Sequence, residues 1–250
     1  MGSQVNAGPG TVAASSPLWK DAPALAFDLG ETLLTYRDTP LSWSDLYGDA
    51  LRAVGAKLER VIGAELIVSA EAILARHNTR LNPRTGEIGA DAIFGEILAS
   101  WRWPLEIRSP AIEAFFGFFQ QRLVAYPETR EVLLTLRKRG VRIGVLTDVP
   151  YGMPRHLVER DLAEAGLADC VDVLLTSVDV GHRKPAREGF LAMATALRVS
   201  IESLVYVGNE PKDIAGPKAA GARAVLINRT GKGIVWGQDE TIRSLDQLLE

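Results

Sequence analysis

Five short apolar runs constrain the fold of this chain more than any other feature. They lie at 24–27, 141–146, 171–175, 204–207 and 222–227. Helical patterns separate the later runs, at 128–139, 154–165, 186–197 and 211–220. Strands that alternate with helices and are almost continuously apolar form parallel sheets covered on both faces. The sequence therefore predicts an α/β fold, with a parallel sheet flanked by helices.

One long region, 37–125, breaks this alternation. It has almost no strand pattern, and its apolar residues recur at helical spacing, with Ser44 and Ser109 as candidate N-caps. We expect an all-helical domain here, inserted into a core made of 22–36 and 126–250. The apolar stretch 114–120 fits either a helix buried in that domain or a dimer face.

The composition narrows the partners and the compartment. The formal net charge is −3, so the chain has no excess of basic residues, which argues against a nucleic-acid partner. No apolar run reaches the length of a membrane span. Cys170 is the only cysteine, so no disulfide can form within the chain and a cytoplasmic location is expected. Residues 1–21 are rich in Gly, Ser, Ala and Pro and are predicted to form a flexible tail.

Polar residues follow four of the predicted strands. Asp28 follows the first run, Thr147 closes the second, Lys184 lies in the loop after the third, and Asp213 comes after the fourth. Each could be an ordinary turn, cap or surface residue. In open parallel sheets, however, ligands bind outside the carboxyl ends of the strands. A carboxylate, a hydroxyl, an ammonium and a second carboxylate together favour a site for a phosphate and Mg²⁺.

The same order of residues resembles the haloacid dehalogenase superfamily. The four motifs of that family correspond here to FDLGET (27–32), VLTD (145–148), RKP (183–185) and VGNEPKDIAGPKAAGA (207–222). The resemblance covers residues 22–228. It implies a Rossmann-like core, and it identifies the helical insert with the cap domain that follows the first motif of the family.

The resemblance also implies roles for individual residues. Asp28 would be the nucleophile that forms an aspartyl-phosphate with a small phosphorylated substrate. Thr147 and Asp148 would bind the substrate, with the Thr147 hydroxyl on the phosphoryl oxygens. Lys184 would neutralise charge on both the nucleophile and the phosphoryl group. Phosphoryl transfer depends mainly on such positioning and neutralisation.

Two positions depart from the phosphatases of the family. Gly30 stands where they carry an Asp that acts as general acid and base, a function typically worth ~10²–10⁴ in rate. Asn209 stands where the fourth motif has its first Asp, so one negative charge is missing. The implied Mg²⁺ ligands are Asp28, the Gly30 carbonyl, Asn209 and Asp213. We therefore expect Mg²⁺ binding to be weakened and proton transfer to suffer.

Three functions remain open from the residues. The first is a Mg²⁺-dependent phosphatase, better suited to acyl or aryl phosphates than to sugar phosphates. The second is a phosphonatase, for which Lys57 is the only lysine of the insert, or a haloacid dehalogenase-like hydrolase. The third is a catalytically degenerate protein that binds phosphate. Glu31 and Glu210 could partly replace the missing acids or simply face solvent, and segment 76–87 could meet an anionic substrate or be a solvated loop.

Overall fold

The computed structural model describes residues 17–40, 42–121 and 123–250. Within these residues the core is a six-stranded sheet in the spatial order β5-β4-β1-β6-β7-β8, and all neighbouring strands are parallel. Its strands are β1 (Ala24–Phe27), β4 (Arg142–Thr147), β5 (Val173–Thr176), β6 (Leu204–Gly208), β7 (Arg223–Ile227) and β8 (Glu240–Ile242). The predicted α/β fold is confirmed, and five of the strands coincide with the five apolar runs.

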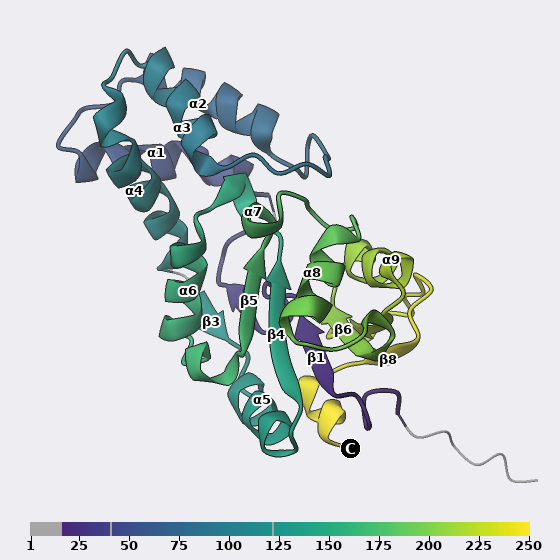
Figure 1. Cartoon of the computed structure of the whole chain (residues 1–250). Helices are drawn as coiled ribbons and strands as arrows, with labels where there is room; N and C mark the ends of the chain where they lie inside the picture. Colours follow the sequence, from purple (N-terminus) through teal and green to yellow (C-terminus); the bar gives the residue numbers. More distant parts are fainter. Residues whose placement is uncertain (1–16, 41, 122) are drawn as a thin grey trace, which may run out of the picture.

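Helices cover both faces of this sheet (Figure 1). They are α5 (Thr129–Lys138), α6 (Arg155–Glu164), α7 (Ser177–Val180), α8 (Glu188–Ala196) and α9 (Pro211–Ala220). Successive residues of β1 point to opposite faces of the sheet. Leu25 and Phe27 join the apolar cluster that includes residues of α5 and α6, whereas Ala24 and Ala26 pack with Phe190 of α8. Because both faces are buried, every position of β1 is apolar.

The insert forms a group of α-helices beyond one end of the sheet (Figure 1). These are α1 (Tyr47–Lys57), α2 (Ala64–His77), α3 (Ala90–Ser100) and α4 (Arg108–Gln120). The two predicted N-caps are wrong. Residues Trp43–Leu46 form a 3-10 turn, so α1 begins after Ser44. Ser109 lies inside α4, whose N-cap position is Ile107.

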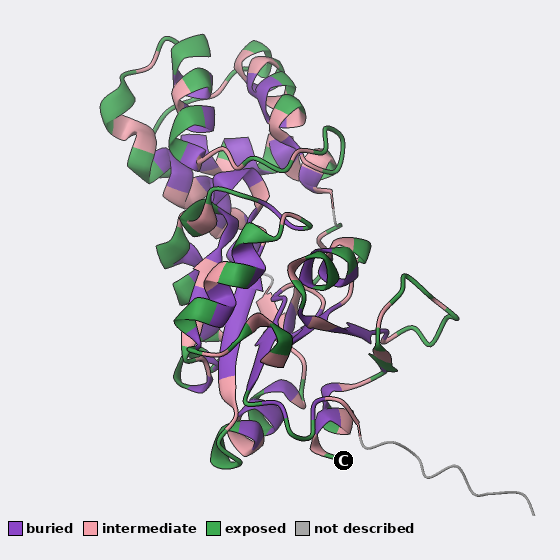
Figure 2. Ribbon diagram, turned by 45° about the vertical axis from the view of Figure 1, so that its right-hand side comes forward, coloured by how far each residue is buried: buried purple, intermediate pink, exposed green. Residues whose placement is uncertain are grey.

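Stretch 114–120 lies within α4, and three of its four phenylalanines are buried in the cap. Phe115, Phe116 and Phe119 are each at most 1% exposed, and the ring of Trp43 stacks on that of Phe119 with centroids 3.7 Å apart. Figure 2 shows how buried residues follow the inner faces of the cap helices. The prediction of a helix buried in the cap is therefore confirmed for these three side chains.

A two-stranded ribbon connects the core to the cap. Its strands, β2 (Leu34–Tyr36) and β3 (Leu123–Ala125), pair antiparallel, with Leu34 opposite Ala125. Neither strand was predicted, and β3 lies inside the range 37–125 that was expected to be helical. The helical part therefore ends near Gln120, at the end of α4. Strands of three residues are too short to show a period of two in the sequence.

The start of the chain differs from the predicted tail where it is described. Residues 1–16 lie outside the described residues. Trp19 is buried, and the backbone N–H of Leu18 donates to Glu240 Oε1 at 2.8 Å. The flexible tail predicted up to Asp21 is therefore wrong for 17–21, which pack against the core. Among the described helices, none combines the length and the apolar character needed to span a membrane.

Candidate active site

The register of the sheet places Asp28 at its carboxyl edge. Phe27, the last residue of β1, lies opposite Val145 of β4 and Val207 of β6. Asp28 follows directly, and its N–H donates to the Val207 carbonyl at 2.9 Å. The residue is only 7% exposed. A carboxylate buried there is costly unless a charged or hydrogen-bonding partner compensates for its lost hydration.

Lys184 supplies that partner. Its Nζ lies 2.6 Å from Asp28 Oδ1 and 2.7 Å from Asp213 Oδ1, and its side chain is 2% exposed. Burial raises the pKa of Asp28 to about 6, against the opposing charge of Lys184. Burial would lower the pKa of Lys184, but the carboxylates of Asp213 and Asp28 outweigh it and hold that pKa well above its usual value. The predicted nucleophile and the predicted lysine are thus in direct contact.

Tyr206 completes the surroundings of the lysine and was missed by sequence reasoning. Lys184 Nζ donates to the Tyr206 hydroxyl at 2.8 Å, and that hydroxyl donates to the Leu146 carbonyl at 2.7 Å. Tyr206 is fully buried in β6. The available signal was a tyrosine in a strand whose neighbours are aliphatic, because a buried phenol needs a polar partner.

Thr147 is the last residue of β4 and Asp148 follows it, and both line the same cleft as Asp28. Asp148 Oδ1 accepts from the backbone N–H of Lys184 at 3.0 Å, and its Oδ2 lies 3.0 Å from Lys212 Nζ. Burial would raise the pKa of Asp148, but Lys184, Lys212 and Arg183 together lower it. Asp148 therefore helps to position the basic side chains of Lys212 and Arg183 in the cleft. Lys212 was not singled out in the sequence.

The fourth motif forms a loop tied together by Asp213. Its Oδ2 accepts the backbone N–H groups of Asn209 at 3.1 Å and of Glu210 at 2.9 Å. A Cβ at Gly208 would lie 2.4 Å from the Cβ of Asp213, so only glycine allows this approach. The Thr32 hydroxyl donates to Asn209 Oδ1 at 3.2 Å. This bond links the first motif to the fourth.

Comparison with known proteins agrees with this arrangement. A family model for haloacid dehalogenase-like hydrolases matches residues 22–221. The chain belongs to this family. It is therefore a hydrolase whose cap follows the first motif.

Individual relatives extend over most of the chain. A phosphoserine phosphatase from Thermus thermophilus is 32% identical over 234 residues, 82% of this chain and 88% of that protein. Phosphatase MT3486 from Mycobacterium tuberculosis is 32% identical over 161 residues, 62% of this chain and 69% of that protein. The structure of a 2-haloacid dehalogenase from Pseudomonas syringae pv. Tomato matches with a TM-score of 0.62 and 26% identity, over 90% of this chain and 96% of that one.

The oxygen donors near Asp28 fit a hard cation such as Mg²⁺ in this haloacid dehalogenase-like hydrolase. Lys184 occupies Asp28 Oδ1, which leaves Oδ2 for a metal. The turn after β1 is closed by the N–H groups of Glu31 and Leu34, so these bonds do not use the Gly30 carbonyl. With the Asn209 amide oxygen, the set is all oxygen, the ligand type that Mg²⁺ prefers. Because only Asp28 is charged, these three ligands together carry one negative charge.

Asp213 stands apart from that set. Its Oδ2 accepts two backbone N–H groups, whereas its buried Oδ1 has no hydrogen-bond partner and lies 2.7 Å from the Lys184 ammonium. Among the described residues no group of three or more His, Cys, Asp or Glu side chains could hold a metal ion. The role of Asp213 as a metal ligand therefore stays a prediction, and its Oδ1 is the oxygen that could take part.

Position 30 opens onto free space. A Cβ built on Gly30 meets no heavy atom within 4 Å. The neighbouring acid does not fill the gap, because the Glu31 carboxylate accepts from the hydroxyls of Thr35 and Tyr126, the latter at 3.0 Å. Glu210 is paired with Lys212 at 2.9 Å and with Arg80. Neither glutamate simply faces solvent, and both are engaged by other groups.

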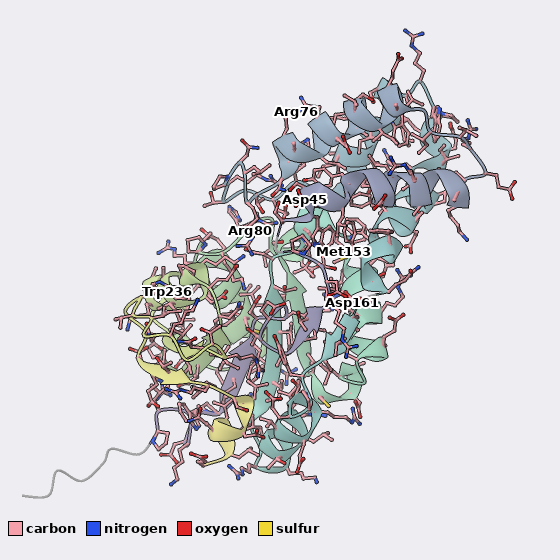
Figure 3. The ribbon with its side chains drawn as sticks, turned by 180° about the vertical axis from the view of Figure 1, so that it is seen from behind. Asp45, Arg76, Arg80, Met153, Asp161 and Trp236 are labelled. Carbon is pink, nitrogen blue, oxygen red and sulfur yellow. The ribbon has the colours of Figure 1, made fainter. Side chains whose placement is uncertain are left out.

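The cap contributes its α2–α3 loop to the site. Arg80 lies where the cap meets the core (Figure 3) and forms an ion pair with Glu210 of the fourth motif. The N–H of Glu87 donates to the Gly181 carbonyl at 3.0 Å, and the Glu87 carboxylate pairs with Arg183. Segment 76–87 is therefore not a free solvated loop. Its residues 78–80 line one side of the cleft over Asp28.

Proposed function

We propose that this hydrolase is a Mg²⁺-dependent phosphatase that acts on a small phosphate ester through an aspartyl-phosphate at Asp28. The observation that carries the proposal is the 2.6 Å contact between Lys184 Nζ and Asp28, in a cleft that Thr147 also lines. A fixed ammonium beside a carboxylate nucleophile neutralises charge on the transferring group. The relatives named as phosphatases support the same assignment.

The chemistry divides into two displacements. In the first, an Asp28 oxygen attacks phosphorus, and the ester P–O bond breaks as the leaving oxygen keeps the electron pair. Lys184 and the Thr147 hydroxyl stabilise the phosphoryl oxygens. In the second, water attacks the same phosphorus, the bond to Asp28 breaks, and inorganic phosphate and a proton are released. Mg²⁺ held by Asp28, Gly30 and Asn209 would neutralise further phosphoryl charge.

Gly30 determines which steps are slow. Nothing at position 30 can protonate the leaving oxygen or deprotonate the attacking water. A leaving group of low basicity needs little protonation, so the first step remains fast for aryl or acyl phosphates. The second step lacks its base for every substrate. Hydrolysis of the aspartyl-phosphate is therefore expected to limit turnover.

The alternatives receive less support. A phosphonatase needs a cap lysine in the cleft, whereas Lys57 is exposed at the end of α1 and is not among the cleft residues. Carbon–halogen hydrolysis uses the same type of nucleophile without a metal, and Asn209 is the observation that favours it. A purely phosphate-binding role would leave the contact between Asp28 and Lys184 without a catalytic purpose.

The test is a rapid-mixing time course with p-nitrophenyl phosphate and acetyl phosphate, with and without Mg²⁺. The wild type should show a Mg²⁺-dependent burst of nitrophenol followed by slow turnover, and Asp28→Asn should lose both. Because position 30 is open, Gly30→Asp should raise steady turnover by roughly 10²-fold. Gly63→Asp, at a second open glycine far from the four motifs, is the matched control and should leave turnover unchanged.

Two results would contradict the proposal. The first is no burst and no turnover with either substrate. The second is a burst that survives in Asp28→Asn, since that substitution removes the attacking oxygen. Release of chloride from 2-chloropropionate, in the absence of phosphatase activity, would assign the chain to carbon–halogen hydrolysis instead.

A further inference from the structure

The cleft over Asp28 has a charged half and an apolar half. The charged half is lined by charged and polar residues of the four motifs and of the cap, namely Asp28, Thr147, Asp148, Asn209, Arg80, Arg183 and Lys212. The apolar half, called here the apolar wall, consists of Tyr36, Trp43, Tyr151, Met153 and Val158. The wall joins residues from the ribbon, the cap and the core. When the phosphate of a substrate reaches Asp28, the rest of the substrate molecule lies near these side chains.

The hydroxyl groups of the two tyrosines in the wall are already hydrogen bonded to the protein. The Tyr36 hydroxyl donates to Asp161 Oδ2 at 2.6 Å. The Tyr151 hydroxyl is hydrogen bonded to that of Tyr47. Asn78, at the edge of the wall, donates from Nδ2 to the same Tyr47 hydroxyl at 2.9 Å. A polyol placed here would lose bonds to water without gaining these groups as partners, which is costly.

The backbone holds this wall in place. Tyr151 has φ of +49°, a left-handed conformation that is uncommon outside glycine. It brings the Tyr151 ring to 5.8 Å from Trp43 and 5.9 Å from Tyr47, measured between centroids. The next residue, Gly152, approaches the cap so closely that a Cβ would lie 2.1 Å from the Ile88 carbonyl oxygen. Strained residues that persist in this way cluster at functional sites.

We infer that the leaving group of the substrate is aromatic or otherwise apolar, and that it binds against the apolar wall. This inference rests on the proposed phosphoryl transfer at Asp28. Two independent features agree with it. The first is that the tyrosine hydroxyls and the Asn78 amide described above already hydrogen bond within the protein, so they are poor partners for a sugar. The second is that Gly30 supplies no acid to a basic leaving oxygen. Phenol-type phosphates meet both conditions, because their leaving oxygen needs little protonation and their ring is apolar.

The first measurement compares two non-hydrolysable ligands by titration calorimetry, using the full chain with Mg²⁺. Methylphosphonate probes only the charged half, and phenylphosphonate probes both halves. Burial of the ring should make phenylphosphonate bind about tenfold more tightly. Equal affinities of the two ligands would overturn the inference, while leaving the phosphatase proposal standing if p-nitrophenyl phosphate is still hydrolysed. Binding of neither ligand, with no turnover, would overturn both.

A variant locates the binding site of the ring. Met153→Gln keeps the length of the side chain but makes the wall polar, so it should reduce the preference for phenylphosphonate at least threefold and leave methylphosphonate affinity unchanged. Leu191→Gln, on the exposed face of α8, is the matched control and should preserve the preference. A preference that is unaffected by Met153→Gln would place the ring elsewhere and overturn the inference. The comparison of ligands on the wild type does not depend on how this variant folds.

Discussion

The buried carboxylate of Asp161 should make the stability of this protein depend on pH. Asp161 lies on α6 and is 0% exposed. It accepts hydrogen bonds from the Tyr36 hydroxyl at 2.6 Å and from Gln120 Nε2 at 2.8 Å. Burial raises its pKa from 3.8 to about 6, although both hydrogen bonds act in the opposite direction. The residue therefore ties the ribbon, the cap helix α4 and the core together at an electrostatic cost.

The magnitude follows from linkage. Because the pKa of the folded state is the higher one, the folded protein binds the proton more tightly than the unfolded chain does. The free energy of unfolding therefore falls as pH rises through this window, beginning near pH 4 and ending just above pH 6. A shift of about two units, at about 1.4 kcal/mol per unit, corresponds to roughly 3 kcal/mol.

Asp161→Asn removes the titration and keeps the size of the side chain. Relative to the wild type, its free energy of unfolding should rise by roughly 3 kcal/mol between about pH 4 and about pH 7. Urea unfolding at several pH values, followed by tryptophan fluorescence, measures this difference. Glu159→Gln changes an exposed acid on the same helix and serves as the control, with a nearly flat difference expected. A flat difference for Asp161→Asn as well would refute the reasoning.

Two further predictions concern single groups near the cleft. Tyr206→Phe removes one hydrogen-bond acceptor of Lys184 and the donor that lies 2.7 Å from the buried Leu146 carbonyl. It should lower both kcat and the free energy of unfolding, the latter by about 1–3 kcal/mol, as steady-state kinetics and urea unfolding would measure. An unchanged kcat would contradict the positioning role of its hydroxyl. Gly152→Ala should destabilise the protein by ~2 kcal/mol or more, because its Cβ meets the cap backbone. Gly140 also has a positive φ but lies in open space, so Gly140→Ala should lower the free energy of unfolding by only about 1–2 kcal/mol, measured by the same urea unfolding. Equal losses would contradict the close approach.

The sheet and the order of its site residues could be predicted because they depend on local pattern. Strands buried on both faces must be apolar at every position, and this signal survives in a single sequence. Parallel strands then bring their carboxyl ends to one edge. Asp28, Thr147 and Lys184 could therefore be assigned to one site before any distance was known. In the structure Asp28 and Thr147 line one cleft, and Lys184 contacts Asp28.

The missed features depend on contacts between distant segments. The ribbon strands β2 and β3 have three residues each, too few to show a period. Lys212 was not singled out in the sequence, and its contacts with Asp148 and Glu210 became visible only in the structure. Likewise, nothing local indicates that Arg80 of the cap meets Glu210 across 130 positions of the chain.

The chemical groups that this protein possesses follow directly from its amino-acid sequence. Position 30 has no carboxylate and position 209 has no negative charge, whatever the chain folds into, and both facts bear directly on catalysis. Tertiary structure alone decided whether neighbouring groups compensate. Glu31 is held by Thr35 and Tyr126, and so it is not free to act for position 30. The physical reason is that side-chain identity is covalent, whereas its direction and partners come from packing between segments far apart in the chain.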